Sequence, residues 1–304
     1  MDFQTTLHEV LKRKLIEVEG PLEFGNGESR TRNLYYLKNL EDNLAVPMSE
    51  RVRSMYEHGS GSELDWKMCS IRSSSAMTFN LLGNGPVVIA SGKHEGTYDL
   101  AYEYQLPTLR NNSHPANLDA YLESEAEAIY CEMKMLEWLG TPRHVLRPDY
   151  LETARYLIPR EDAEQFVALF GKLAGVLVMG KSRRTERLSD GRYDSLQMAK
   201  HLLAIYGKVA NSPTYRPKKI TLLNCVWELT DPSVLGRHEA RYREMEAEEH
   251  AGFERFAELA GEHVAPLFET KGVPLSVEYV TTADLIRAIE YEAPHREKLE
   301  RYIV

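Results

Sequence analysis

Three charged residues near the middle of the chain, Asp119, Glu132 and Lys134, have the types and the spacing of a catalytic centre. Residues 128–136 have the pattern of a β-strand, in which successive side chains point to opposite faces. Glu132 and Lys134 therefore project from one face. If the chain turns back at residues 125–126, Asp119 lies opposite Glu132, with the two Cβ atoms about 5 Å apart. Two acids and an ammonium group are thus predicted to share one face of a β-hairpin.

Two carboxylates placed opposite one another repel unless a cation lies between them. Mg²⁺ is the natural candidate, because it prefers oxygen ligands and keeps several waters, so that few protein ligands suffice. We expect Asp119, Glu132 and the backbone carbonyl of Met133 to bind Mg²⁺, and Mn²⁺ to be able to replace it. The ammonium of Lys134 would orient or help deprotonate a metal-bound water and stabilise charge on a phosphate group.

The spacing Asp-x12-Glu-x-Lys resembles the catalytic signature of the PD-(D/E)XK nucleases, although a strand with solubilising Glu and Lys residues would show the same pattern. A wider resemblance, to a bacterial family of restriction endonucleases, covers residues 59–229. Seven stretches carry it: GSGSEL (59–64), SSSAMTFNLLG (73–83), YEYQLPTL (102–109), ANLDAYLES (116–124), YCEMKMLE (130–137), QMAKHLL (197–203) and LLNCVWEL (222–229). Leu118 stands where the name-giving motif has proline, which leaves the metal ligands unaffected. The resemblance implies a restriction-endonuclease-like core and a metal-dependent nuclease.

Two further acids, Glu63 and Glu103, are candidates to add a carboxylate to the metal or to position a water. Glu63 follows a glycine-rich turn, and Glu103 lies on the strand predicted before Asp119. Each has a structural alternative. An acid after a glycine turn also stabilises the start of a helix, which would explain Glu63 without a metal.

Gln197, Lys200 and His201 lie together on one predicted helix, with Gln197 and His201 four residues apart on one face. The resemblance implies that Gln197 is a catalytic residue and that Lys200 contacts the DNA backbone, with His201 as a further DNA-contact candidate. The alternative for Gln197 is local. Asp194-x-x-Gln197 also fits a capping box, in which both side chains bond backbone N–H groups at the start of the helix.

The formal net charge of −9 by itself speaks against a nucleic-acid partner. The charge is unevenly distributed, because residues 181–219 hold ten basic and three acidic side chains. Within this segment Arg183, Arg184 and Arg187 are candidates for contacts with DNA phosphates. A solvated basic loop is the alternative.

The composition, 43% hydrophobic and 27% charged, is that of a globular protein that can bury a substantial core. No apolar run approaches the roughly 20 residues needed to span a bilayer, and the N-terminus has no signal-peptide core. We therefore expect a cytoplasmic protein with no membrane partner. Its three cysteines are far apart in the sequence, which argues against a zinc site or a disulfide framework.

The elements that must position these residues predict an α/β fold with a central mixed β-sheet of four or five strands flanked by helices. Strands are expected at residues 97–105, 117–123, 128–136, 220–229 and 275–280, the last as an edge strand. Helices are expected at residues 6–18, 49–58, 73–82, 161–177, 194–210 and 237–264. We divide the chain into an N-terminal helical elaboration (1–70), a PD-(D/E)XK nuclease core (71–235) and a C-terminal helical elaboration (236–304) packed on the same domain.

These patterns favour a Mg²⁺-dependent endonuclease that hydrolyses phosphodiester bonds in DNA, in restriction or another defence role. Cutting both strands of a duplex would favour a homodimer. Two alternatives remain: a protein of the same fold that binds nucleic acid without cutting it, and a protein-interaction module. Metal-dependent cleavage would distinguish the endonuclease from both alternatives. Salt-sensitive DNA binding would distinguish the nucleic-acid-binding protein from the protein-interaction module.

Overall fold

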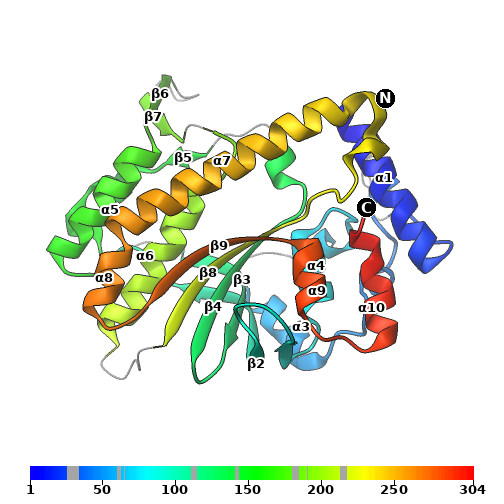
Figure 1. Cartoon of the computed structure of the whole chain (residues 1–304), viewed down its shortest axis with the longest axis horizontal. Helices are drawn as coiled ribbons and strands as arrows, with labels where there is room; N and C mark the ends of the chain where they lie inside the picture. Colours follow the sequence, from blue (N-terminus) through cyan, green and yellow to red (C-terminus); the bar gives the residue numbers. More distant parts are fainter. Residues whose placement is uncertain are drawn as a thin grey trace.

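The computed structural model of the 304-residue chain describes residues 1–25, 34–59, 63–64, 66–110, 115–140, 144–179, 185–189, 191–212 and 218–304. Its centre is a six-stranded sheet in the order β1-β2-β3-β4-β8-β9 (Figure 1). The strands are β1 (Val87–Ile89), β2 (Gly96–Leu106), β3 (Ala116–Glu123), β4 (Glu127–Lys134), β8 (Lys219–Val226) and β9 (Leu275–Thr281). Neighbours from β1 to β4 are antiparallel, whereas β4, β8 and β9 are parallel. The sheet is therefore mixed, as predicted, with six strands where four or five were expected.

The alternation along β4 separates two hydrophobic cores. Ile129, Cys131 and Met133 pack into one core, and Ala128 and Tyr130 pack into the other. The predicted division of β4 into two faces is confirmed. Because both faces of the sheet are covered, the strand is buried along almost its whole length.

Helices cover both faces of the sheet (Figure 1). One core includes residues from α1 (Phe3–Glu19), α3 (Glu50–Glu57), α4 (Ser74–Leu82), α9 (Thr282–Ala288) and α10 (Ala293–Leu299). The other includes residues from α5 (Arg160–Leu173), α6 (Ser195–Asn211) and α8 (Ala265–Thr270). The long helix α7 (Glu239–His263) contributes to both, through Tyr242 near its start and Phe256 further along. Short 3-10 helices connect these elements at Glu41–Asn43, Lys67–Cys69, Glu137–Leu139, Pro148–Leu151, Thr153–Arg155, Pro232–His238 and Glu300–Tyr302.

A second, three-stranded sheet was not anticipated. It has the order β5-β7-β6 and consists of β5 (Val145–Leu146), β6 (Val176–Met179) and β7 (Thr185–Leu188). The helix predicted over residues 161–177 is wrong at its C-terminal end, because α5 stops at Leu173 and Leu177 pairs with Arg187. The run from Val176 is rich in β-branched residues, which favour a pleated strand over a helix.

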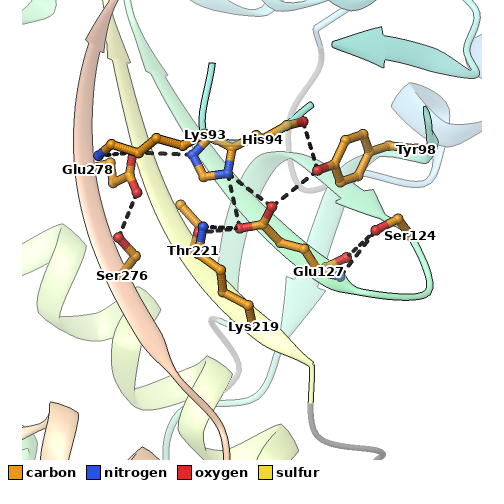
Figure 2. Close-up of polar contacts among 9 residues, drawn as sticks. All are labelled: Lys93, His94, Tyr98, Ser124, Glu127, Lys219, Thr221, Ser276 and Glu278. Carbon is orange, nitrogen blue, oxygen red and sulfur yellow. Dashed lines mark hydrogen bonds and ion pairs between the residues drawn. The ribbon is translucent and has the colours of Figure 1, made fainter. Parts of the chain in front are cut away.

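A polar cluster surrounds Glu127, where β4 begins (Figure 2). Lys134 is at the other end of that strand. His94, from the connection between β1 and β2, lies between two carboxylates: Nδ1 is 3.0 Å from Oε2 of Glu127, and Nε2 is 3.2 Å from Oε2 of Glu278. The hydroxyls of Tyr98 and Thr221 also donate to Glu127, at 3.1 and 2.8 Å. The cluster connects the β1–β2 connection to the starts of β4 and β8 and to the middle of β9.

The C-terminal part of the chain completes the central sheet, since β9 pairs with β8 and forms the predicted edge strand. The domain boundaries at residues 70 and 235 stay predictions. Within the described ranges, no helix combines the length and the apolar character needed to cross a membrane.

Candidate active site

The β3–β4 hairpin has the predicted register. Ala120 pairs with Cys131, and extending this register by one residue places Asp119 opposite Glu132. The carboxylate of Asp119 reaches across to β4, where Oδ2 accepts a hydrogen bond from the backbone N–H of Met133 at 2.6 Å. This contact holds Asp119 beside Glu132 at the end of the hairpin ladder.

Glu132 is the centre of a hydrogen-bonded network. Its side chain is buried, and its Oε1 lies 2.7 Å from the ammonium of Lys134 and accepts a hydrogen bond from Nε2 of Gln197 at 2.8 Å. Its other oxygen, Oε2, contacts Nε2 of His201 at 2.9 Å. Lys134 also donates to Oε1 of Gln197 at 2.7 Å. The structure therefore brings four predicted site residues together: Glu132 and Lys134 from β4, and Gln197 and His201 from α6.

Burial and charge affect the two carboxyls in opposite directions. Burial, reinforced by the charge of Glu132, raises the pKa of Asp119 well above its ordinary value. Burial acts in the same direction on Glu132, but Lys134 and the hydrogen bond with His201 outweigh it and lower the pKa of Glu132. Burial would lower the pKa of Lys134, but Glu132 raises it on balance. Glu132 and Lys134 form a charged pair, while the charge of Lys134 offsets only part of the effect of burial on Asp119.

A cavity of about 920 Å³ opens beside this pair, and its lining includes Asp119, Glu132, Lys134, Glu63 and Glu103. The residues predicted around the metal are therefore gathered in one hollow. A cavity of this volume lies at the upper end of the range for ligand sites.

Both carboxylate oxygens of Glu63 contact other side chains. Lys67 lies 2.9 Å from Oε1, and the hydroxyl of Ser75 donates to Oε2 at 2.8 Å. Since Ser75 is in the first turn of α4, the carboxylate of Glu63 lies near the start of that helix. This placement suits the structural alternative, although Glu63 also lines the cavity.

Glu103 lies at an interruption of the β2–β3 ladder. Tyr102 pairs with Ala120 and Tyr104 pairs with Leu118, while Glu103 between them has a φ of 50°. A positive φ is unfavourable for a residue with a Cβ, and such strained positions concentrate at functional sites. The register places Glu103 across from Asp119, and Asn117 donates to its carboxylate. Among the residues that the structure describes, no group of three or more His, Cys, Asp or Glu side chains is arranged to hold a metal ion.

A family model described as Restriction Endonuclease associating with ARP matches residues 9–303. The chain belongs to this family. The resemblance to restriction endonucleases is thereby confirmed, and the mixed sheet flanked by helices agrees with a restriction-endonuclease-like fold. Neither the curated proteins nor the solved structures compared with the chain gave a match.

In this member of the restriction-endonuclease family, the backbone and the side chain of Gln197 make different contacts. Its backbone N–H bonds Oδ1 of Asp194 at 3.0 Å, so Asp194 caps α6. The side chain of Gln197 instead contacts Glu132 and Lys134. Only the Asp194 half of the proposed capping box is therefore formed.

Lys200 points to a second cavity of about 310 Å³, which Gln197 and His201 also line. Burial lowers the pKa of Lys200; the charge of Asp194 opposes this shift, and the smaller effect of Arg147, in the same lining, adds to it. Its ammonium lies 5.4 Å from the centre of the Tyr150 ring. Lys200 is next to the Glu132 network but is not part of it.

The basic segment is only partly described. Arg187 is exposed on β7 and lines neither of the two cavities. Arg183 and Arg184 lie outside the described residues. The structure therefore does not bring Arg187 to the Glu132 network.

Several residues of the cavity lining were missed in the sequence, and they come from the N-terminal part of the chain. Arg72 and His8 are the most prominent, together with Lys67 and Gln4. The one local signal was that Arg72 directly precedes the serines predicted to cap α4. His8 carries no such signal, because only the packing of α1 brings it to the cavity.

Proposed function

We propose that the protein is a divalent-metal-dependent endonuclease that hydrolyses phosphodiester bonds in DNA. The observation that carries this proposal is the grouping of Asp119, Glu132 and Lys134 at one cavity, in a chain of the restriction-endonuclease family. Metal-dependent phosphodiester hydrolysis requires acidic ligands and a positive charge for the phosphate, and these three residues supply both kinds of group.

The donor set suits a hard cation. Asp119 is a buried carboxyl whose pKa is raised by burial and by its acidic neighbour, and a bound cation would offset both effects. Mg²⁺, with Mn²⁺ as a substitute, would be held by Asp119, Glu132 and the backbone carbonyl of Met133, with water completing the shell. When bound, it would supply a water of lowered pKa and positive charge for the phosphate. Glu103 is the stronger additional ligand candidate, because the β2–β3 register places it across from Asp119.

Lys134 acts as a fixed positive charge. Because Glu132 raises its pKa, the amine stays protonated at neutral pH and is not available to remove a proton. We therefore assign it to stabilising charge on the phosphate rather than to deprotonating water. Gln197 accepts a hydrogen bond from this ammonium, which fixes its direction. His201 is buried against Glu132, and a positioning role toward that carboxylate suits it better than contact with DNA.

The DNA strand outside the centre would be held by cations. Lys200 lines the neighbouring cavity and is our first choice for a phosphate contact. Arg183, Arg184 and Arg187 are proposed to contact phosphates further along the duplex. We propose a homodimer as the form that cuts both strands, acting in the cytoplasm in restriction or another defence process.

The test is to incubate the purified protein with plasmid and linear DNA in Mg²⁺, in Mn²⁺ and in EDTA, beside a Lys134→Ala variant. We expect cleavage by the parent in either metal, and none in EDTA or by the variant. Salt-sensitive DNA binding without metal-dependent cleavage would favour a binding protein on this fold. Neither binding nor cleavage would favour a protein-interaction module.

A further inference from the structure

Arg72 adds a positive charge, beside those of Lys134 and Lys67, to the cavity that holds Asp119 and Glu132. It precedes Ser73, the residue that caps α4, and its side chain is partly buried. Lys67 and the first residues of α4 belong to the same lining. The cavity thus combines the acidic residues of β3 and β4 with Arg72 from the N-terminal third of the chain, where Lys67 is already paired with Glu63.

The guanidinium of Arg72 has no carboxylate partner among the described residues. Its recorded side-chain contact is with His8, whose Nε2 lies 3.4 Å from one terminal nitrogen, and its Nε atom is buried without a hydrogen-bond partner. A guanidinium remains charged at all physiological pH values. Partial burial of a cation without a counter-charge destabilises the fold, and a bound anion offsets this cost. Arg72 is therefore prepared for an anionic ligand in the cavity.

His8 fixes the direction of this guanidinium. Burial, together with the charge of Arg72, lowers the pKa of His8 to about 4, so the ring is neutral at pH 7. In the tautomer with its proton on Nδ1, a neutral ring accepts a hydrogen bond at Nε2, which is the nitrogen facing Arg72. The ring of Tyr35 packs against His8 with the centroids 4.8 Å apart. His8 is thus a rigid acceptor held by α1.

The first turn of α4 adds to the same positive potential. The N–H groups that begin a helix have no partner within it, and the helix dipole favours an anion nearby. Ser73 accepts from the N–H of Ala76, and Ser74 and Ser75 follow directly in the cavity lining. The helix supports the charge of Arg72 but does not by itself define a site.

We propose that Arg72 binds a phosphate group of the nucleic-acid strand whose scissile bond lies at Asp119, Glu132 and Lys134, with His8 as a positioning residue. This proposal rests on the proposed nuclease function. The strand enters the cavity with one phosphate at the acidic residues and another at the fork of Arg72, which can donate two parallel hydrogen bonds to phosphate oxygens. The N-terminal part of the chain then belongs to the substrate site.

The test measures DNA binding separately from cleavage. Fluorescence anisotropy with a short labelled duplex, in EDTA and over a range of salt concentrations, compares Arg72→Gln with Arg13→Gln. Arg13 is exposed on α1 and is not part of the cavity lining, so it controls for the loss of one positive charge. We expect Arg72→Gln to weaken binding about tenfold and to flatten the log-affinity against log-salt slope by about 0.9, the value for one phosphate contact. Arg72→Lys should keep the salt slope but bind DNA less tightly than the parent, because lysine keeps the charge without the planar fork of the guanidinium. Parental affinity in this variant would contradict the proposal.

His8 is tested by rescue. His8→Gln keeps a hydrogen-bond acceptor and should bind DNA more tightly than His8→Leu, which removes it. The effect of His8→Leu should largely vanish when Arg72 is already glutamine, because the two residues act through one contact. Thermal melts identify folded variants, and Arg72→Lys covers the case in which the glutamine variant does not fold.

The outcomes separate this proposal from the proposed function. If Arg72→Gln binds DNA with the affinity and salt slope of Arg13→Gln, Arg72 holds no phosphate, and Lys134-dependent cleavage by the parent still supports the nuclease. A parent that neither binds nor cleaves DNA overturns both. A loss of binding in Arg72→Gln but not in Arg13→Gln, with the melting temperature retained, supports the phosphate site.

Discussion

Nε2 of His201 lies 2.9 Å from Oε2 of Glu132, and both side chains are buried. An ionised carboxylate can only accept hydrogen bonds, so Nε2 carries the proton. The opposite ring nitrogen, Nδ1, is buried without a hydrogen-bond partner. The imidazole therefore directs its one paired nitrogen at the carboxylate that also contacts Lys134.

Replacing His201 with alanine should shift the pH dependence of cleavage. The hydrogen bond with His201 is among the causes that lower the pKa of Glu132, so its loss raises that pKa. If ionised Glu132 is required, the acidic limb of kcat/KM moves to higher pH, and a profile measured from pH 5 to 9 would detect it. The control is His58→Ala, at an exposed position after α3. An unshifted acidic limb in active His201→Ala would contradict the assigned role.

Gln197 and Asp194 should separate activity from stability. Gln197→Ala keeps the backbone N–H that Asp194 caps but removes the contacts with Glu132 and Lys134. We expect it to lower single-turnover cleavage by tenfold or more with little loss of stability. Asp194→Ala removes the cap and should lower the free energy of unfolding by about 1 kcal/mol. Thermal melts and cleavage rates of both variants distinguish the two roles. If Gln197 only stabilises the fold, Gln197→Ala lowers the melting temperature and leaves the cleavage rate unchanged.

The hairpin that carries the site was predictable because its determinants are local. Alternation in β4 assigns Glu132 to one face, and the position of the turn sets the register with Asp119. The helix that supplies Gln197 was also recognisable from its cap and its apolar periodicity. These signals lie within the segments themselves, so they can be read without knowing the rest of the fold.

Other parts of the site depend on packing between distant segments. His8 and Arg72 meet across 64 residues, and no local pattern predicts such a contact. The positive φ of Glu103 is strain that the surrounding structure imposes on a non-glycine residue. The strand at Val176–Met179 follows α5 so closely that its apolar residues were assigned to the helix, and its pairing with β7 reveals it as a strand.

Arg183, Arg184 and Arg187, in the basic segment, should increase the affinity for DNA by a similar factor whatever the DNA sequence. Arg183→Ala, Arg184→Ala and Arg187→Ala should each flatten the log-affinity against log-salt slope by about 0.9 if the side chain contacts a phosphate. Anisotropy with two duplexes of different sequence measures both effects. Arg160→Ala, at an exposed position on α5, is the control. A slope equal to that of the control would mean that the arginine makes no phosphate contact.

His94 should make stability depend on pH. The hydrogen bond with Glu278 is the largest cause raising the pKa of His94, and the same pair lowers the pKa of Glu278 to about 2. A raised histidine pKa stabilises the fold fully below the unfolded value, and this stability is lost as pH rises through the folded value. His94→Gln should therefore lower the free energy of unfolding by on the order of 1–2 kcal/mol at pH 5.5 and by less at pH 9.

Urea unfolding of the parent and of His94→Gln at both pH values measures this difference. The lowered pKa of Glu278 acts in the other direction, since its stabilisation is lost as pH falls toward 2, well below the range tested. His58→Gln should show no such trend. Equal destabilisation by His94→Gln at pH 5.5 and pH 9 would mean that the charge of His94 does not contribute.

The metal centre can be tested through stability, because Asp119 and Glu132 should respond differently to substitution. Asp119→Asn keeps an oxygen for the N–H of Met133 but removes a carboxyl whose pKa is raised. A raised carboxyl pKa destabilises the fold at neutral pH, so without metal this variant should melt at or above the temperature of the parent. Glu132→Gln instead breaks the buried pair with Lys134 and should be destabilised by about 3 kcal/mol.

Added Mg²⁺ should raise the melting temperature of the parent, because a ligand that binds only the folded protein stabilises it, by about 2.7 kcal/mol at a hundredfold excess over Kd. In Asp119→Asn, both the Mg²⁺-dependent increase in melting temperature and DNA cleavage should be lost. In Lys134→Ala the increase should largely survive while cleavage is lost, since the lysine is not a ligand. Ca²⁺, which is larger and less strict in geometry, should stabilise the parent without supporting turnover. If Asp119→Asn keeps the full Mg²⁺-dependent increase, the ion binds elsewhere, and the assignment of Asp119 as a ligand is wrong.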